Sequence, residues 1–283
     1  MTAIAFGLLT ALLFGIASYL GPVLSRSHSP SAVLAVGQVA ALAVATVLLV
    51  ARGASAPDGR FIVLGLLAGV ANGLALAAMF EAGRFLPISV MAPIGATGGI
   101  VPVVVAVALG ERPAVLQLAG IPLAIIGVVL VASGQGGPSG LRTITTVAPI
   151  GLRLAATWAL FYGIFLSLFA QSSVGDQTWA VFTSRLTLLG TALTLSLMRR
   201  SSLRLPLRTV PLAAVNGLLI LGGVISFGLA TGAGLVSVVS VLATLSPLVT
   251  VALAIMLLHE RLGRWQQVGL AAAIVGIVLL AAG

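Results

Sequence analysis

The sequence predicts an all-α integral membrane protein with ten transmembrane helices, arranged as two inverted five-helix repeats around a central cavity. The first observation is the composition: 60% of the residues are hydrophobic and 7% are charged, and the mean hydropathy is +1.24. A soluble domain with so little charge would expose large apolar patches to water. The second observation is a series of ten apolar runs rich in Leu, Ala, Val and Gly. Such runs are typical of membrane helices rather than of the weakly alternating strands of a β-barrel. The third observation is an internal duplication.

The duplicated segment begins at a Glu-Arg turn and continues into an uncharged helix. Residues 109–134 read LGERPAVLQLAGIPLAIIGVVLVASG, residues 258–283 read LHERLGRWQQVGLAAAIVGIVLLAAG, and 12 of the 26 aligned residues are identical. About 20 apolar residues are enough to cross a bilayer at about 1.5 Å per residue. Duplicated halves are typical of membrane transporters built from repeats. The charged motif residues are Glu111, Arg112, Glu260 and Arg261.

Ten apolar segments follow one another along the chain, and each break between them has the composition of a turn. Stretches such as RGASAPDGR and RRSSLRLPLR are rich in the residues that end helices. The first segment lacks the basic start of a signal peptide, so we expect it to be retained as a membrane helix. The helices of the first half are expected at 2–24, 31–51, 60–80, 88–109 and 114–133. Those of the second half are expected at 150–171, 178–198, 210–230, 235–258 and 265–282.

A linker rich in Gly, Pro and Ser divides the chain into two repeats. We expect the first repeat at 1–134, the linker at 135–149 and the second repeat at 150–283. Because each repeat holds an odd number of helices, the second enters the membrane in the opposite direction. The expected symmetry is an inverted repeat about an axis in the membrane plane.

The arginines give one estimate of orientation. Arg52, Arg60 and Arg112 fall on the face of the predicted termini, and ten other arginines fall on the opposite face. Since cytoplasmic loops carry the excess of basic residues, this count alone places both termini outside the cytoplasm.

Polar residues at membrane depth are the candidate substrate-binding groups, because an unpaired polar group in hydrocarbon is costly. Arg185 lies inside the helix TWAVFTSRLTLLG, and its planar guanidinium suits a carboxylate or phosphate. The alternative is a side chain that reaches the interface or pairs with backbone carbonyls. Gln38, its counterpart in the first repeat, and Asn72 either line a cavity or hold neighbouring helices together.

Two aromatic residues suggest which face of a helix points inward. Trp158 and Tyr162 are four residues apart and therefore share one helix face. They align with Thr10 and Phe14 of the first repeat, which favours a cavity-lining role. The alternative is an interfacial aromatic belt.

Small residues and prolines recur at matching places in the two halves. Proline bends a helix by removing a hydrogen bond, and repeat transporters place their substrate at such interrupted helices. Ordinary packing kinks are the alternative. The expected hinge residues are Pro93, Pro102 and Pro247, and the expected binding residues beside them are Thr97, Ser240 and Thr244.

Several other kinds of site are excluded by what the sequence lacks. The chain has no cysteine, so thiol chemistry and disulfides are excluded. His28 and His259 are isolated, so we expect no metal site, and no catalytic motif predicts an enzyme or a cofactor. The 14 arginines are scattered over short loops, which argues against nucleic-acid binding. Glu111 and Glu260 are expected to set turns and helix ends, and Glu81 is the one acid expected near a cavity mouth.

The paired motif resembles the drug/metabolite transporter superfamily, in its ten-helix EamA-type branch. The resemblance implies an inverted-repeat fold with a central cavity, alternating access, export of amino acids, metabolites or drugs, and cytoplasmic termini, which is opposite to the arginine count. Two departures are a first helix without the membrane-embedded acid of the small multidrug-resistance relatives, and Gln38 where the family often has Arg. The residues that carry the resemblance are Leu109, Gly110, Glu111, Arg112, Gln117, Gly120 and Gly127, with Glu260, Arg261, Gln266, Gly269 and Gly276 in the second copy and the segment 89–93 before the first.

Together these patterns predict a secondary transporter of a cell inner membrane that exports small polar metabolites such as amino acids. Arg185 would hold the substrate carboxylate, and Trp158 and Tyr162 would pack on its body. The expected partners are a small-molecule substrate, the lipid bilayer and protons as a candidate coupling ion, in a monomer or homodimer. The alternatives are an organic-cation efflux transporter that depends on Glu81, a non-transporting membrane scaffold, and a membrane-embedded lipid enzyme.

Overall fold

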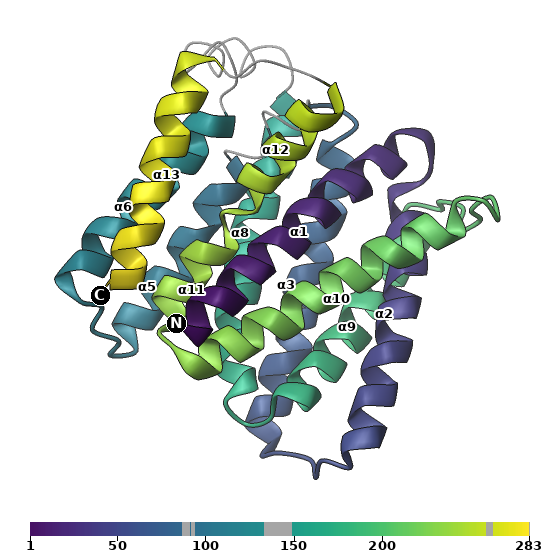
Figure 1. Cartoon of the computed structure of the whole chain (residues 1–283). Coiled ribbons are helices and arrows are strands. Elements are labelled where there is room, and N and C mark those ends of the chain that lie inside the picture. Colours follow the sequence, from purple (N-terminus) through teal and green to yellow (C-terminus); the bar gives the residue numbers. More distant parts are fainter. Residues whose placement is uncertain (87–90, 92–93, 133–148, 259–262, 283) are drawn as a thin grey trace.

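The computed structural model describes residues 1–86, 91, 94–132, 149–258 and 263–282, and every element in these ranges is a helix (Figure 1). The predicted all-α fold class is therefore confirmed for the described residues. Six of the described helices are long and apolar enough to cross a membrane. They are α1 (Thr2–Ser27), α2 (Pro30–Arg52), α3 (Gly59–Ala82), α8 (Pro149–Ser173), α9 (Gln177–Met198) and α10 (Val210–Ala233).

One segment expected as a single helix, 235–258, is interrupted. It forms α11 (Val236–Ala243), and after two residues outside any helix it continues as α12 (Ser246–Leu258). Pro247 accounts for the break, because its nitrogen has no hydrogen to donate to the carbonyl one turn earlier. The interruption lies in the middle of the segment, where the two short helices meet.

The matching segment of the first half also changes its winding. A short 3-10 turn, η1 (Thr97–Gly99), leads into α5 (Ile100–Ala108), with Pro102 in the first turn of α5. Two further apolar helices complete the described part of the chain. They are α6 (Val115–Ala132) and α13 (Arg264–Ala282).

The loops divide between two faces of the bundle, which we name the terminal face and the distal face (Figure 1). The terminal face carries the start of α1, the end of α13 and the loops at 53–58, 109–114, 174–176 and 234–235. The distal face carries the loops at 28–29, 83–86 and 199–209.

Polar contacts join loops within each face. On the terminal face Arg52 Nη1 lies 2.7 Å from Thr178 Oγ1 and 3.6 Å from Asp176 Oδ2. On the distal face Arg199 Nη1 lies 3.6 Å from Glu81 Oε2. Each face is therefore tied together by contacts between elements that are distant in the sequence.

Helices α6 and α13 cross at glycines and run in opposite directions. A Cβ added at Gly120 would lie 2.9 Å from the carbonyl oxygen of Gly276, and one added at Gly127 would lie 2.7 Å from that of Gly269. Small residues let helix backbones approach closely in a membrane. The order of these contacts, in which one helix rises in number as the other falls, makes the pair antiparallel.

Helices α2 and α9 form a second antiparallel pair. Ser31 at the start of α2 meets Ser201 just after α9, with 2.7 Å between their hydroxyls, and Arg52 at the end of α2 meets Thr178 at the start of α9. Around these two helices, α1 packs against α10 and α3 packs against α8. The main hydrophobic core draws buried residues from all six of these long helices.

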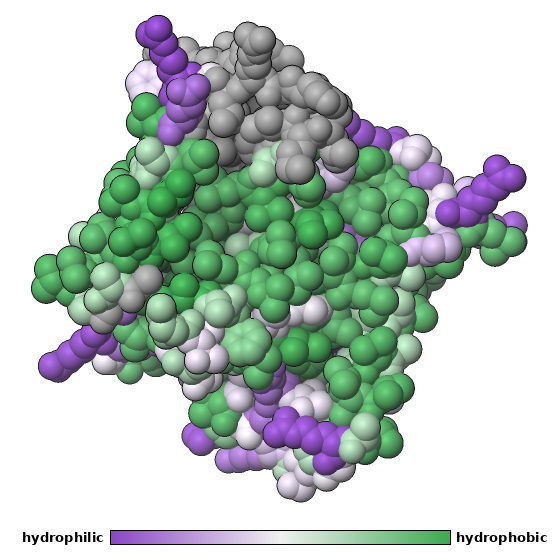
Figure 2. All heavy atoms as spheres, in the orientation of Figure 1, coloured by the Kyte–Doolittle hydropathy of each residue, from purple (hydrophilic) through white to green (hydrophobic). Residues whose placement is uncertain are grey.

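The outer surface is apolar over its middle. Large hydrophobic side chains such as Val47, Val50 and Val104 are more than half exposed, and Figure 2 shows hydrophobic residues covering most of the visible face with hydrophilic side chains near its edges. Such a surface suits contact with lipid, where apolar groups need no water and backbone groups are paired inside helices.

Candidate functional site

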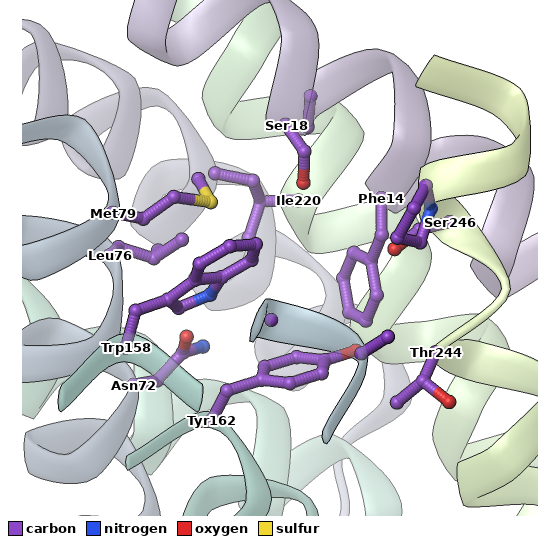
Figure 3. A pocket seen from close by; sticks show the side chains of 14 residues that line it. Phe14, Ser18, Asn72, Leu76, Met79, Trp158, Tyr162, Ile220, Thr244 and Ser246 are labelled. Carbon is purple, nitrogen blue, oxygen red and sulfur yellow. The ribbon is translucent and has the colours of Figure 1, made fainter. Parts of the chain in front are cut away.

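A pocket lies in the core, between the long helices and the two interrupted segments (Figure 3). The space outside protein atoms, including its opening, is about 510 Å³, but a sphere the size of a water molecule finds only about 30 Å³ of room for its centre, so the pocket is narrow in this conformation. Phe14 and Asn72 line it from one half of the chain, and Trp158, Tyr162 and Thr244 line it from the other. Three predicted binding residues of the second half therefore meet one of the first half around a single space.

Aromatic rings form one wall of this pocket. Phe14 and Tyr162 meet edge to face, with 6.1 Å between ring centroids and an interplanar angle of 75°. Behind Tyr162 a chain of rings continues through Phe165 and Phe169 to Phe227, with centroid separations between 5.7 and 6.3 Å. Edge-to-face and tilted contacts are favourable ring geometries, so this chain holds the Tyr162 ring in place.

The position of the Trp158 ring requires a glycine in the first half of the chain. Its indole is 9% exposed and lies against Gly95, where any Cβ would overlap the ring. The spacing of Trp158 and Tyr162 predicted an inward-facing Trp158, but no sequence pattern singled out Gly95. The glycine leaves the room that a flat ring needs beside the backbone.

Two polar atoms in the pocket wall lack hydrogen-bond partners among the described residues. They are Asn72 Nδ2 and Tyr162 Oη, and both are buried. A buried polar group left unpaired costs about 1–3 kcal/mol. Such groups in a pocket wall are suited to binding the polar atoms of a ligand.

The other predicted residues of the interrupted segments differ in position. Thr244 and Pro247 line the pocket, and the Thr244 hydroxyl donates to the Val241 carbonyl at 2.8 Å. Ser240 is fully buried in α11, and its Oγ has no partner among the described residues. Thr97 is exposed and donates to the Ile94 carbonyl at 2.6 Å, outside the pocket lining.

Three remaining predicted residues cannot be placed. Pro93, Glu260 and Arg261 lie outside the described residues. Pro102 is buried in α5 and does not line the pocket.

Arg185 and Gln38 come together away from the pocket lining. Both are fully buried, and Arg185 Nη1 donates to Gln38 Oε1 at 3.4 Å between α9 and α2. Arg185 Nε and Nη2 and Gln38 Nε2 have no partner among the described residues. A buried cation with unpaired N–H groups is costly in a membrane, so this arginine is a second place where an acceptor is missing.

The acids of the described residues are all engaged elsewhere. Asp58 pairs with Arg60, and Asp176 with Arg52, on the terminal face. Glu81 lies 3.3 Å from Arg84 and 3.6 Å from Arg199 on the distal face. Glu111 accepts hydrogen bonds from α11. The Arg185 guanidinium consequently has no carboxylate partner in the described part of the chain.

Glu81, expected near a cavity mouth, lines a separate polar pocket on the distal face. This pocket holds about 1040 Å³ of space and is also lined by Arg26, His28, Arg84 and Arg199. A small second cavity shares the lining residues Ser18, Met79 and Trp158 with the central pocket. It is also lined by Met91 and Thr250.

The aliphatic part of the pocket lining was not predicted from the sequence. Leu76, Met79 and Ile220 line it beside the polar residues. In helices that are apolar on every side, periodicity does not separate core-facing from lipid-facing aliphatic residues. The one available signal was the repeat, since Ile220 aligns with Asn72 at nearly the offset that relates the two halves.

Comparison with known proteins agrees with this architecture. Residues 1–133 match the EamA-like transporter family. A solved structure described only as the crystal structure of a protein superposes with a TM-score of 0.75, at 17% sequence identity, over 98% of this chain and 95% of its own. That likeness shows a shared fold. No curated protein matches the chain in sequence. Residues 1–133 are therefore a domain of the EamA-like transporter family, and the chain is a multi-pass membrane protein.

Proposed function

We propose that this protein is a secondary transporter that exports small polar metabolites such as amino acids across a cell inner membrane by alternating access. The observation that carries the proposal is the central pocket, which is built from both halves of the chain and offers unpaired polar atoms beside aromatic rings. Sites of this kind, mostly apolar with a few placed polar groups, are typical of small-molecule binding.

Contacts between repeat-related residues support an inverted repeat of 1–134 and 150–283. Phe14 touches its counterpart Tyr162, and Gln38 touches its counterpart Arg185. A residue can touch its own counterpart only near the axis that relates the two halves. Since α2 runs antiparallel to α9 and α6 to α13, that axis lies in the membrane plane, and the pocket lies beside it.

Within this proposal the pocket residues have separate roles. Trp158, Tyr162 and Phe14 pack on the apolar body of the substrate. Asn72 donates through Nδ2 and Tyr162 through Oη to its polar atoms. Thr244, whose own hydrogen is donated to Val241, offers a hydroxyl oxygen as an acceptor for an amino group.

Arg185 is the proposed partner of the substrate carboxylate. The support is its unpaired guanidinium, which carries the only buried charge among the described residues. It does not line the pocket in this conformation, so we propose that it meets the carboxylate in another access state. Movement would be concentrated where the helices are already interrupted, between α11 and α12 near Pro247 and between η1 and α5 near Pro102.

The test is solute counterflow in proteoliposomes, with a panel of amino acids and related zwitterions, in the presence and absence of a pH gradient. We expect Trp158→Ala to reduce exchange at least tenfold, since it removes the largest ring of the site. Trp265→Ala is the matched control, because Trp265 is 48% exposed on α13. The proposal is wrong if no solute exchanges, or if Trp158→Ala and Arg185→Ala both leave exchange of every accepted solute unchanged.

One observation favours an organic-cation transporter as a second candidate. Three aromatic rings face a pocket without a charged side chain among its described lining residues, and such rings attract quaternary amines. This candidate predicts efflux of cationic dyes and loss of efflux in Glu81→Gln. Amino-acid exchange without dye efflux excludes it.

A further inference from the structure

Glu111 forms a network of hydrogen bonds that links the two halves of the chain. Its carboxylate accepts from the Val236 backbone N–H at 2.7 Å, from the Ser237 backbone N–H at 3.0 Å and from the Ser237 hydroxyl at 2.7 Å. Glu111 follows α5 in the first half, and the donors form the start of α11 in the second. These three bonds tie the turn after α5 to the start of α11 on the terminal face.

The start of α11 has no cap of its own. The residue at its N-cap position is Leu235, which offers no side-chain acceptor. The first N–H groups of a helix need an acceptor, and the positive end of the helix dipole favours an anion. Glu111 supplies both from another part of the chain.

The turn at Gly110 ends α5 and fixes the backbone position of Glu111. Gly110 has φ of +101°, a backbone conformation that favours glycine, and the Glu111 N–H closes the end of α5 by donating to the Ala106 carbonyl at 3.0 Å. The neighbouring Gln117 caps its own helix instead, accepting from Ala114 N at 3.0 Å. Gln117 therefore bonds within the first half, whereas the Glu111 carboxylate bonds to α11 in the second half.

The helix that Glu111 holds carries part of the pocket. Ser240 lies one turn after Ser237, and Thr244, which directly follows α11, lines the pocket and packs on Gly99 of the first half. All residues of α11 from Ser237 to Ala243 are buried. Helix α11 therefore runs from the terminal face, where Glu111 holds its start, to the pocket that Thr244 lines just after its end.

We propose that Glu111 is a positioning residue that holds the transporter closed on its terminal face, and that release of its bonds to α11 accompanies opening on this face. This inference rests on the proposed function, because it assigns Glu111 to one step of alternating access. Loss of the carboxylate removes a helix cap and a charge-assisted contact, which shifts the balance toward the state open on the terminal face.

The test uses single cysteines, which the chain allows because it contains none. Ser240→Cys reports opening, since Ser240 is fully buried and its hydroxyl has no partner to lose among the described residues. Ser25→Cys, fully buried at the distal end of α1, reports general loosening of the fold. A membrane-impermeant maleimide is applied to sealed vesicles whose orientation is fixed by labelling Thr2→Cys.

We expect Glu111→Ala and Glu111→Gln to raise the labelling rate of Ser240→Cys from the terminal face on the order of tenfold, as the loss of a helix cap would produce. Ser237→Ala, which removes one of three bonds, raises it less. Asp58→Asn is the matched control, because Asp58 caps only its own helix on the same face. Labelling of Ser25→Cys stays unchanged throughout.

Two results overturn the inference. One is unchanged labelling of Ser240→Cys in both Glu111 variants. The other is an equal rise at Ser25→Cys, which shows that Glu111 only stabilises the fold. Because labelling requires no substrate, its outcome is independent of the counterflow screen, and failure of the proposed function appears in that screen alone.

Discussion

At the scale of single residues, the distinguishing feature is a set of polar groups without partners in an apolar core. Asn72, Tyr162 and Arg185 each keep at least one buried polar atom unpaired among the described residues. An unpaired group lowers stability and is retained where function requires it. Variants that remove only the polar atom should therefore separate stability from transport.

Arg185→Gln tests this separation for the charge. We expect the unfolding temperature in detergent to rise or stay level, because an unpaired buried cation is removed, while the KM of counterflow rises at least tenfold. Arg185→Lys, which keeps the charge but not the planar fork, should restore KM in part. Arg199→Gln serves as a control, because Arg199 is an exposed arginine. A fall in stability with unchanged KM would assign Arg185 a structural role.

Tyr162→Phe tests the pocket hydroxyl. The ring contacts with Phe14 and Phe165 remain, so the unfolding temperature should not fall. Substrate affinity should fall about five- to tenfold, which corresponds to about 1 kcal/mol for one lost hydrogen bond. Tyr19→Phe, a change at a partly exposed tyrosine that does not line the pocket, is the control. Equal affinities for the wild type and Tyr162→Phe would exclude the hydroxyl from the site.

At the scale of elements, close glycine contacts decide how helices pair. Gly127 and Gly276 sit at the crossing of α6 with α13, and a Cβ at Gly276 would lie 2.6 Å from the backbone nitrogen of Ala124. Backbone atoms cannot give way as a flexible side chain can. The crossing therefore tolerates no added carbon without separation of the two helices.

Gly127→Ala should lower the free energy of unfolding by about 1–3 kcal/mol, the usual cost of overpacking. Gly190→Ala is the matched control, because no atom lies within 4 Å of a Cβ at Gly190. There the same change should be neutral or slightly stabilising, since alanine favours helix more than glycine does. Thermal unfolding in detergent measures both variants. Equal losses in the two variants would show that helix propensity, and not the crossing, sets the effect.

The elements were more predictable than the direction of their side chains. Apolar runs and turn residues placed the helices, and the four-residue spacing of Trp158 and Tyr162 correctly put both on one face at the pocket. The helix of Arg185 carries Thr and Ser residues on more than one side, so its polar pattern did not show that the guanidinium faces α2. Thr97 was expected at the pocket, but a 3-10 turn rotates it outward. The bonds of Glu111 join residues more than a hundred positions apart, which no local pattern reveals.

At the scale of the whole molecule, the arrangement of loops predicts which segments share a side of the membrane. The start of α1 and the end of α13 lie on the terminal face, and the loop 199–209 lies on the distal face (Figure 1). Most of the loop arginines lie on the distal face, whereas the resemblance to EamA-type transporters implies cytoplasmic termini. The arginine count and the family resemblance therefore predict opposite orientations of the chain in the membrane, and labelling can decide between them.

Single cysteines at Thr2, Ala282 and Ser202 test the arrangement. We expect the first two to react from the same side with an impermeant reagent, and Ser202→Cys to react from the other. The side that labels Ser202→Cys in intact cells then decides between the arginine count and the family expectation. Reaction of Thr2→Cys and Ala282→Cys from opposite sides would contradict the whole arrangement.

In the proposed inverted repeat, the residues that meet across the axis are not identical. A phenyl ring faces a phenol where Phe14 meets Tyr162, and a neutral amide faces a cation where Gln38 meets Arg185. Two identical halves would give the inward-open and outward-open states equal energies by symmetry. Each unlike pair removes part of that degeneracy, so an empty carrier of this design rests preferentially toward one compartment, and its uptake and release constants differ between the two sides.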